Sequence, residues 1–95
     1  MTYQESSDLM NDVSFRGRIK VAALDIATYY LGEDPSTYAH NSRYKWAQSV
    51  FLSPDSVAAQ FQPAVVMDTQ VQTDGTAITD SALKSAVEGV VNKLI

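Results

Sequence analysis

Residues 64–78 are Ala64-Val-Val-Met-Asp-Thr-Gln-Val-Gln-Thr-Asp-Gly-Thr-Ala-Ile78, and this stretch interrupts a sequence that is otherwise helical in pattern. Asp or Gln occupies the even positions from 68 to 74. The odd positions are apolar or β-branched, namely Val65, Met67, Thr69, Val71 and Thr73. Alternation with a period of two residues is typical of an extended segment that buries one face. We therefore predict an extended arm over residues 64–78, which begins after Pro63.

A lone extended arm needs a surface to lie on, because it cannot pair its own backbone groups and an isolated hairpin is only marginally stable in water. We expect that surface to belong to a partner chain. The candidate partner-binding residues are those on the apolar face of the arm: Val65, Met67, Thr69, Val71 and Thr73. On this hypothesis, Val65→Lys combined with Val71→Lys would leave the helical body folded and abolish assembly.

The longest predicted helix begins between Thr2 and Ser7 and ends before Gly32. Its apolar residues recur at spacings of three and four: Phe15, Ile19, Ala22, Ala23, Ile26, Ala27 and Tyr30. Further apolar residues at Val13, Val21, Leu24 and Leu31 make its second half apolar almost all round. We therefore expect this helix to be buried on most sides. Gly17 costs about 1 kcal/mol relative to alanine within a helix, which indicates a bend or the close approach of another backbone.

Three further helices are predicted from capping signals. Asp34-Pro35 opens a helix that continues through Phe51, and Ser53-Pro54 opens a two-turn helix that ends before Pro63. Thr79 is the expected N-cap of the last helix, with Asp80 in its first turn and Lys93 in its last. The predicted fold is mainly α: a single domain over residues 1–95, built as a small bundle of about four helices. The helical body spans 6–62 and 79–95, and the extended arm precedes the C-terminal helix.

The composition argues against several classes of function. The 95 residues include no cysteine and one histidine, His40, so zinc sites of the ordinary kind and Cys/His nucleophile pairs are not expected within one chain. Neither a nucleophile turn nor a glycine-rich phosphate loop occurs. The apolar runs are too short for a membrane span of about 18 residues, and no signal peptide is evident at the first residues. We expect no enzymatic activity, no cofactor, no metal and no membrane contact.

Seven basic and eleven acidic residues leave a net charge of −4, so nucleic acid contact is not expected. A local basic cluster at Arg16, Arg18 and Lys20 leaves two interpretations open. It could contact phosphates, or it could form a solvated helix face on which Asp12 pairs with Arg16 four residues later. Aromatic residues concentrate between Tyr29 and Trp46, and we expect Trp46 to be buried against the longest helix.

Five short segments carry a resemblance to known proteins: Arg18-Ile-Lys-Val-Ala-Ala23, Arg43-Tyr-Lys-Trp-Ala47, Ser53-Pro54, Thr79-Asp80 and Val91-Asn-Lys-Leu94. Together they make the chain resemble the small cysteine-free virion proteins of tailed bacteriophages, a group that includes head completion, neck and minor capsid subunits. The resemblance implies a non-enzymatic structural subunit, located in the virion, that forms homo-oligomers and contacts other virion proteins. The alternative is a small helical adaptor or regulatory protein that binds one protein partner.

Overall fold

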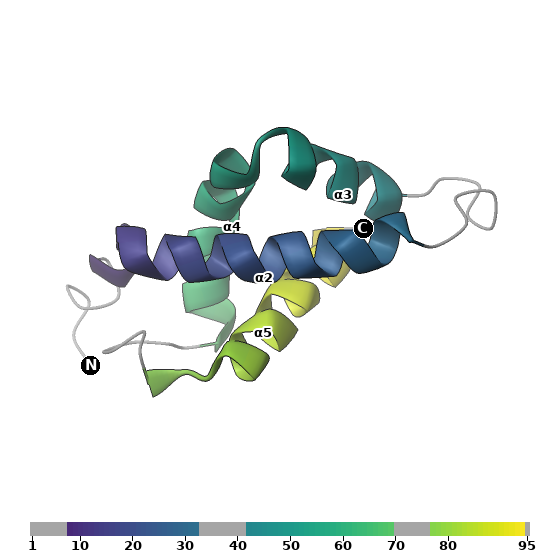
Figure 1. Cartoon of the computed structure of the whole chain (residues 1–95). Helices are drawn as coiled ribbons and strands as arrows, with labels where there is room; N and C mark the ends of the chain where they lie inside the picture. The colour runs from purple at the N-terminus through teal and green to yellow at the C-terminus, as the bar shows by residue number, and fades with distance from the viewer. Residues whose placement is uncertain (1–7, 33–41, 70–76, 95) are drawn as a thin grey trace.

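The computed structural model describes residues 8–32, 42–69 and 77–94, which form a small helical bundle (Figure 1). Its helices are α2 (Val13–Leu31), α3 (Ser42–Leu52), α4 (Pro54–Thr69) and α5 (Asp80–Leu94). Helix α2 contacts each of the other three, and α4 also contacts α3 and α5. No strand occurs among the described residues. The predicted mainly α bundle is therefore confirmed.

The inner face of α2 is the centre of the hydrophobic core. The buried residues of this helix are the seven predicted from spacing: Phe15, Ile19, Ala22, Ala23, Ile26, Ala27 and Tyr30. They pack with apolar residues of the other helices, such as Val50, Val66 and Val87. The helix ends at Leu31 as expected, and the backbone N–H of Gly32 still donates to the carbonyl of Thr28.

The start of α2 differs from the prediction of a helix beginning between Thr2 and Ser7. The helix begins at Val13, and Asp12 is its N-cap, with a side-chain oxygen that accepts a hydrogen bond of 3.1 Å from the backbone N–H of Phe15. Before this cap, the amide Nε2 of Gln62 on α4 donates to the carbonyls of Leu9 and Asp12. The start of α2 at Val13 is thus stabilised by Gln62, a residue 50 positions beyond Asp12 in the chain. Local capping signals cannot anticipate a contact of this kind.

The prediction of an extended arm is wrong for the residues that the structure describes. Helix α4 begins at Pro54, as expected, but it continues through Pro63 to Thr69. A proline inside a helix removes one hydrogen bond and costs about 3 kcal/mol. Pro63 and Ala59, whose carbonyl loses its donor, are both exposed, so water can satisfy that carbonyl. The turn beyond Pro63 buries Val65 and Val66, which offsets the cost of the proline.

The beginning of α5 agrees with the sequence prediction. The hydroxyl of Thr79 accepts a hydrogen bond of 3.1 Å from the backbone N–H of Ala82, as expected for an N-cap. Asp80 lies in the first turn and Lys93 in the last, each placed favourably for the helix dipole. The remainder of the predicted arm, residues 70–76, and the Asp34-Pro35 helix start lie outside the described residues.

Trp46 of α3 joins three helices through aromatic contacts. Its ring stacks on Phe61 of α4 at a centroid distance of 5.7 Å and meets the edge of Tyr30 of α2 at 6.1 Å. The side chain is partly buried and packs against the core, so the expected contact with α2 is confirmed. Its indole Nε1 is buried and has no hydrogen-bond partner among the described residues.

Candidate assembly surface

The residues predicted to form a partner-binding arm do not share one exposed face. Val65 is fully buried in the core, Met67 is 68 % exposed, and Thr69 is half-buried at the end of α4. Val71 and Thr73 lie outside the described residues. The alternation with period two fails here because positions 65 and 66 are buried together, as adjacent residues on the inner side of a helix can be. Of the three members of this set that the structure describes, Met67 is the one exposed apolar candidate.

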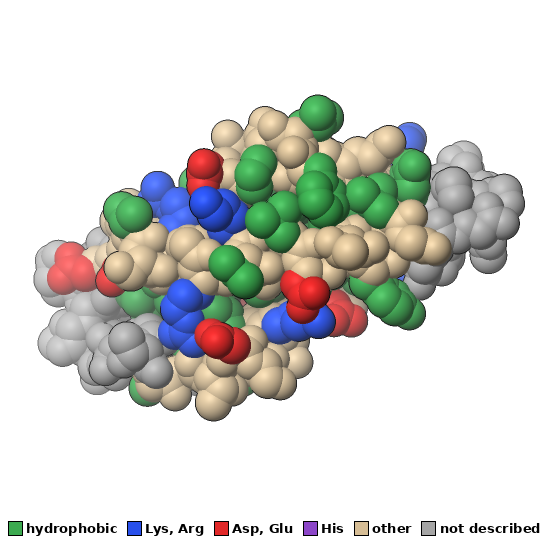
Figure 2. Space-filling model, viewed as in Figure 1, with side chains coloured by type: hydrophobic (Ala, Val, Ile, Leu, Met, Phe, Trp, Pro, Cys, Tyr) green, Lys and Arg blue, Asp and Glu red, His purple; other side chains and the backbone are tan. Residues whose placement is uncertain are grey.

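The outer face of α2 is the larger exposed apolar feature, and it contradicts the expectation that this helix is buried on most sides. Val13 is 75 % exposed and Val21 is 65 % exposed. On the neighbouring α3, Leu52 is 83 % exposed and Phe51 is 49 % exposed. Figure 2 shows hydrophobic side chains gathered over α3 and along its boundary with α2. The described helices therefore leave one apolar side of α2 without a cover.

A groove of about 850 Å³ lies between α2 and the first turns of α5. Its α2 wall carries Ser14, Gly17, Val21, Leu24 and Thr28, which recur at alternating spacings of three and four residues. Leu31 continues the same spacing. These six positions follow the a and d positions of a heptad repeat, the pattern with which a helix packs against another helix. We name this row of six positions the α2 seam. Sequence inspection of the spacing could have found it, but the buried stripe on the opposite face dominates the same helix.

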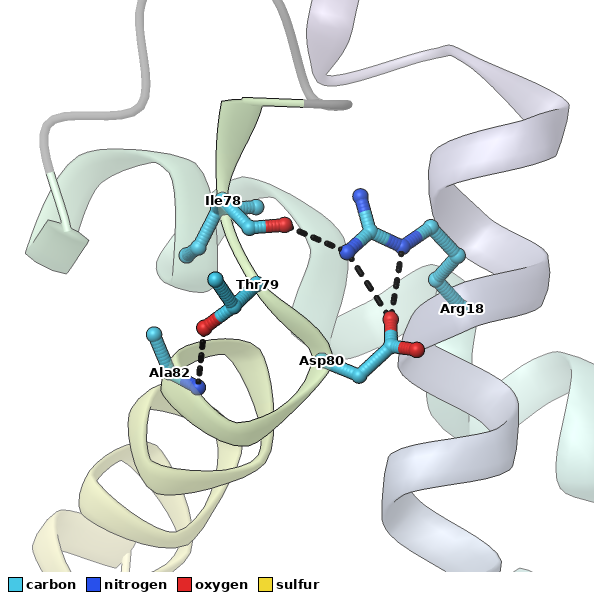
Figure 3. A network of polar contacts seen from close by, with 5 residues as sticks. All are labelled: Arg18, Ile78, Thr79, Asp80 and Ala82. Carbon is cyan, nitrogen blue, oxygen red and sulfur yellow. Dashed lines mark hydrogen bonds and ion pairs between the residues drawn. The ribbon is translucent and has the colours of Figure 1, made fainter.

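The α5 side of the groove is held to α2 by Arg18 (Figure 3). The guanidinium of Arg18 donates to Asp80 Oδ1, from Nη2 at 2.9 Å and from Nε at 3.2 Å. Its Nη2 also donates to the carbonyl of Ile78 at 2.6 Å, immediately before the Thr79 cap. One arginine of α2 thus fixes the residues at which α5 begins.

A second ion pair across the groove joins Asp25 of α2 to Lys84 of α5, with an N–O distance of 2.7 Å. The hydrogen bond from Lys84 to Asp25, reinforced by attraction to that carboxylate, raises the pKa of the lysine above its ordinary value of 10.5. Because the folded-state pKa is raised, the stabilisation from this pair is present at neutral pH and is lost as pH rises through the pKa of Lys84. Both groups are exposed to solvent, so the pair contributes little to stability.

The other residues of the basic cluster also have partners within the chain. Arg16 Nε donates to Gln62 Oε1 at 2.7 Å, in place of the expected ion pair with Asp12. Lys20 forms an ion pair with Asp55 at the start of α4, with an N–O distance of 3.2 Å. These contacts connect α2 to α4, so the cluster has a structural role in the bundle.

No group of three or more His, Cys, Asp or Glu side chains comes together to hold a metal ion within residues 8–32, 42–69 and 77–94. His40 lies outside these ranges. Of the helices described, none combines the length and the apolar character that crossing a membrane requires. The charged groups of the groove form two ion pairs, Arg18 with Asp80 and Asp25 with Lys84, and its other polar side chains are the hydroxyls of Ser14, Thr28 and Ser81.

Comparisons of the chain with protein family models, with curated proteins and with solved structures found no match. The functional interpretation therefore rests on the residues of this chain and on the surfaces that the fold leaves exposed.

Proposed function

We propose that this chain is a non-enzymatic structural subunit of a tailed bacteriophage particle, which acts through protein–protein contacts in the head or neck. The observation that carries the contact role is the exposed apolar side of α2, where Val21 is 65 % exposed in the middle of the longest helix. Scattered apolar residues are normal on protein surfaces, but apolar residues at heptad spacing, such as Val21, Leu24 and Leu31, are typical of a helix that packs against a partner.

The assignment to a phage particle is supported by the resemblance of five sequence segments to small virion proteins, and the small helical bundle is compatible with it. Arg16, Arg18 and Lys20 are each engaged within the chain, which favours contact with proteins over contact with nucleic acid. Other virion proteins and further copies of this chain are the partners we propose, and Met67 remains a candidate contact residue.

The test is to purify phage particles from the host that carries this gene and to quantify the protein by mass spectrometry across a density gradient. We expect it to co-sediment with the major capsid protein at a constant ratio, including after a high-salt wash. Recovery only from the soluble fraction, in complex with one cellular protein, would contradict the proposal and support the adaptor alternative.

A further inference from the structure

We propose that the α2 seam is a dimerisation surface, on which α2 of a second copy packs in antiparallel orientation. Ser14, Val21 and Thr28 of the seam are exposed and Gly17 is half-buried, whereas Leu24 and Leu31 are partly buried and also pack against the core. In Figure 1, α3 lies above α2 and the first turns of α5 lie below it, and those turns form the other wall of the groove that contains five of the seam positions. This inference names the partner in the proposed assembly role and rests on that role.

Gly17 gives the first reason to place another helix there. The sequence left two explanations for a glycine at this position: a bend in the helix, or a close backbone approach. The structure shows α2 as one uninterrupted helix from Val13 to Leu31. A Cβ atom added at Gly17 would have no described atom within 4 Å, so nothing in the described fold requires a glycine. The space beside Gly17 can therefore accept the close approach of another helix, which a second copy would supply; Gly89 is equally open but does not belong to the seam.

The sizes of the seam residues favour the antiparallel orientation. When Val21 of one copy faces Leu24 of the other, Ser14 faces Leu31 and Gly17 faces Thr28, so each small residue meets a larger one. A parallel pair would instead place Ser14 against Ser14 and Gly17 against Gly17 at one end, and Leu31 against Leu31 at the other. The antiparallel arrangement fills the interface evenly along its length.

The charges beside the seam select one register. On the groove side, Arg18 and Asp25 occupy equivalent heptad positions, and such positions face each other across an antiparallel helix pair. In the register that pairs Val21 with Leu24, Arg18 of each copy lies opposite Asp25 of the other. If one α2 helix were shifted by one heptad along the other, the Arg18 residues of the two copies would face each other. A shift in the opposite direction would bring the two Asp25 residues together, and like charges repel. Because Arg18 already binds Asp80 and Asp25 binds Lys84, the dimer would join two ion pairs into a network of four charges on each side of the symmetry axis.

The principal test uses a pair of glycine substitutions measured by sedimentation equilibrium on the purified chain. Gly17→Ala and Gly89→Ala each add one methyl group to a helix, at positions where no described atom lies within 4 Å. Both should raise the melting temperature of the dilute protein by roughly 4 to 8 °C, because alanine favours the helix. Only Gly17→Ala should weaken the dimer, by about tenfold or more, whereas Gly89→Ala should leave its dissociation constant unchanged. Val21→Glu, at an exposed position, should abolish the dimer while preserving the helical circular dichroism.

The orientation is tested by disulfide formation, since the chain contains no cysteine of its own. A mixture of the Ser14→Cys and Leu31→Cys variants should form a mixed disulfide. Ser14→Cys alone should not, because its two copies would lie about 25 Å apart along the helix axes. A protein that stays monomeric at high concentration, a dimer insensitive to Gly17→Ala, or cross-linking of Ser14→Cys to itself would each overturn the proposal. These measurements need only the purified chain, so their failure is distinguishable from a failure of the particle experiment.

Discussion

Gln62 shows how a single residue can connect distant parts of this small fold. It is the one buried polar side chain among the described residues, with an exposed fraction of 0 %. Its amide donates to the carbonyls of Leu9 and Asp12 and accepts from Arg16, so its hydrogen-bonding groups are used at both ends. Burial of an amide is tolerated here because each polar atom has a partner.

Replacement of Gln62 by alanine should therefore destabilise the fold by about 2 to 4 kcal/mol, because it leaves two carbonyls and a guanidinium without their partner. Gln62→Glu should be similarly harmful, since a carboxylate keeps the contact with Arg16 but repels both carbonyls. The matched control is Gln60→Ala on the exposed side of the same helix, with an expected change within about 0.5 kcal/mol. Urea unfolding followed by circular dichroism measures all three; equal effects at positions 60 and 62 would contradict this account.

Trp46 combines favourable ring contacts with an unfavourable polar group. Trp46→Ala should cost about 3 to 5 kcal/mol, because it removes the ring that stacks on Phe61 and meets Tyr30. Trp46→Phe keeps an aromatic ring and eliminates the buried N–H that lacks a partner, so its cost should be at most about 1 kcal/mol. If the two variants unfold at the same denaturant concentration, the ring contacts do not stabilise the bundle.

At the scale of the element, α4 is the helix whose length local rules misjudge. Its first residue, Pro54, is a proline where proline is favourable, and Pro63 is a proline in the interior where it is not. The helix continues through Pro63 because Phe61, Val65 and Val66 are buried on the opposite side. Tertiary packing thus maintains a helix that its own backbone would interrupt.

The two prolines of α4 provide a matched comparison. Pro63→Ala should stabilise the protein by about 1 to 2 kcal/mol, because the alanine N–H can donate a hydrogen bond to the carbonyl of Ala59. This gain is partly offset because alanine gives the unfolded chain more conformational entropy than proline does. Pro54→Ala should be neutral or slightly destabilising, because no helical hydrogen bond is gained at the first position. Thermal unfolding monitored at 222 nm is the measurement. A lower melting temperature for Pro63→Ala would show that the helix does not continue through residue 63 in solution.

At the scale of the whole molecule, α2 has an apolar surface that builds the core and an outer surface, only partly apolar, on which Val13 and Val21 are exposed. The inner surface holds the other three helices around α2. The outer surface carries the α2 seam, bordered by ion pairs to α5. This arrangement leaves the outer surface of α2 available for the proposed second copy.

The continuation of α4 reverses the expected result of charging the predicted arm. Val65→Lys should unfold the bundle, at a cost of at least about 3 kcal/mol, because the lysine would be buried without a partner. Met67→Lys is the matched control two residues away; its side chain is 68 % exposed, so circular dichroism and the unfolding midpoint should barely change. A folded Val65→Lys protein would instead support an extended conformation for these residues.

Local patterns were enough to predict the class of fold, the seven residues of the α2 core face, the start of α4 at Pro54 and the N-cap at Thr79, because caps and helical spacing involve only neighbouring residues. The end of α4 and the start of α2 could not be predicted in this way. Val65 and Val66 are helical because the core covers them, and Asp12 begins a helix because Gln62, 50 residues away, binds the carbonyls before it. The α2 seam could likewise be predicted only in part from the sequence. The heptad spacing of the α2 seam is present in the sequence, but a helix with apolar residues almost all round cannot reveal which side its own chain will cover. Only the placement of α3, α4 and α5 around α2 distinguishes the core face from the free one, because burial is a property of the packed molecule.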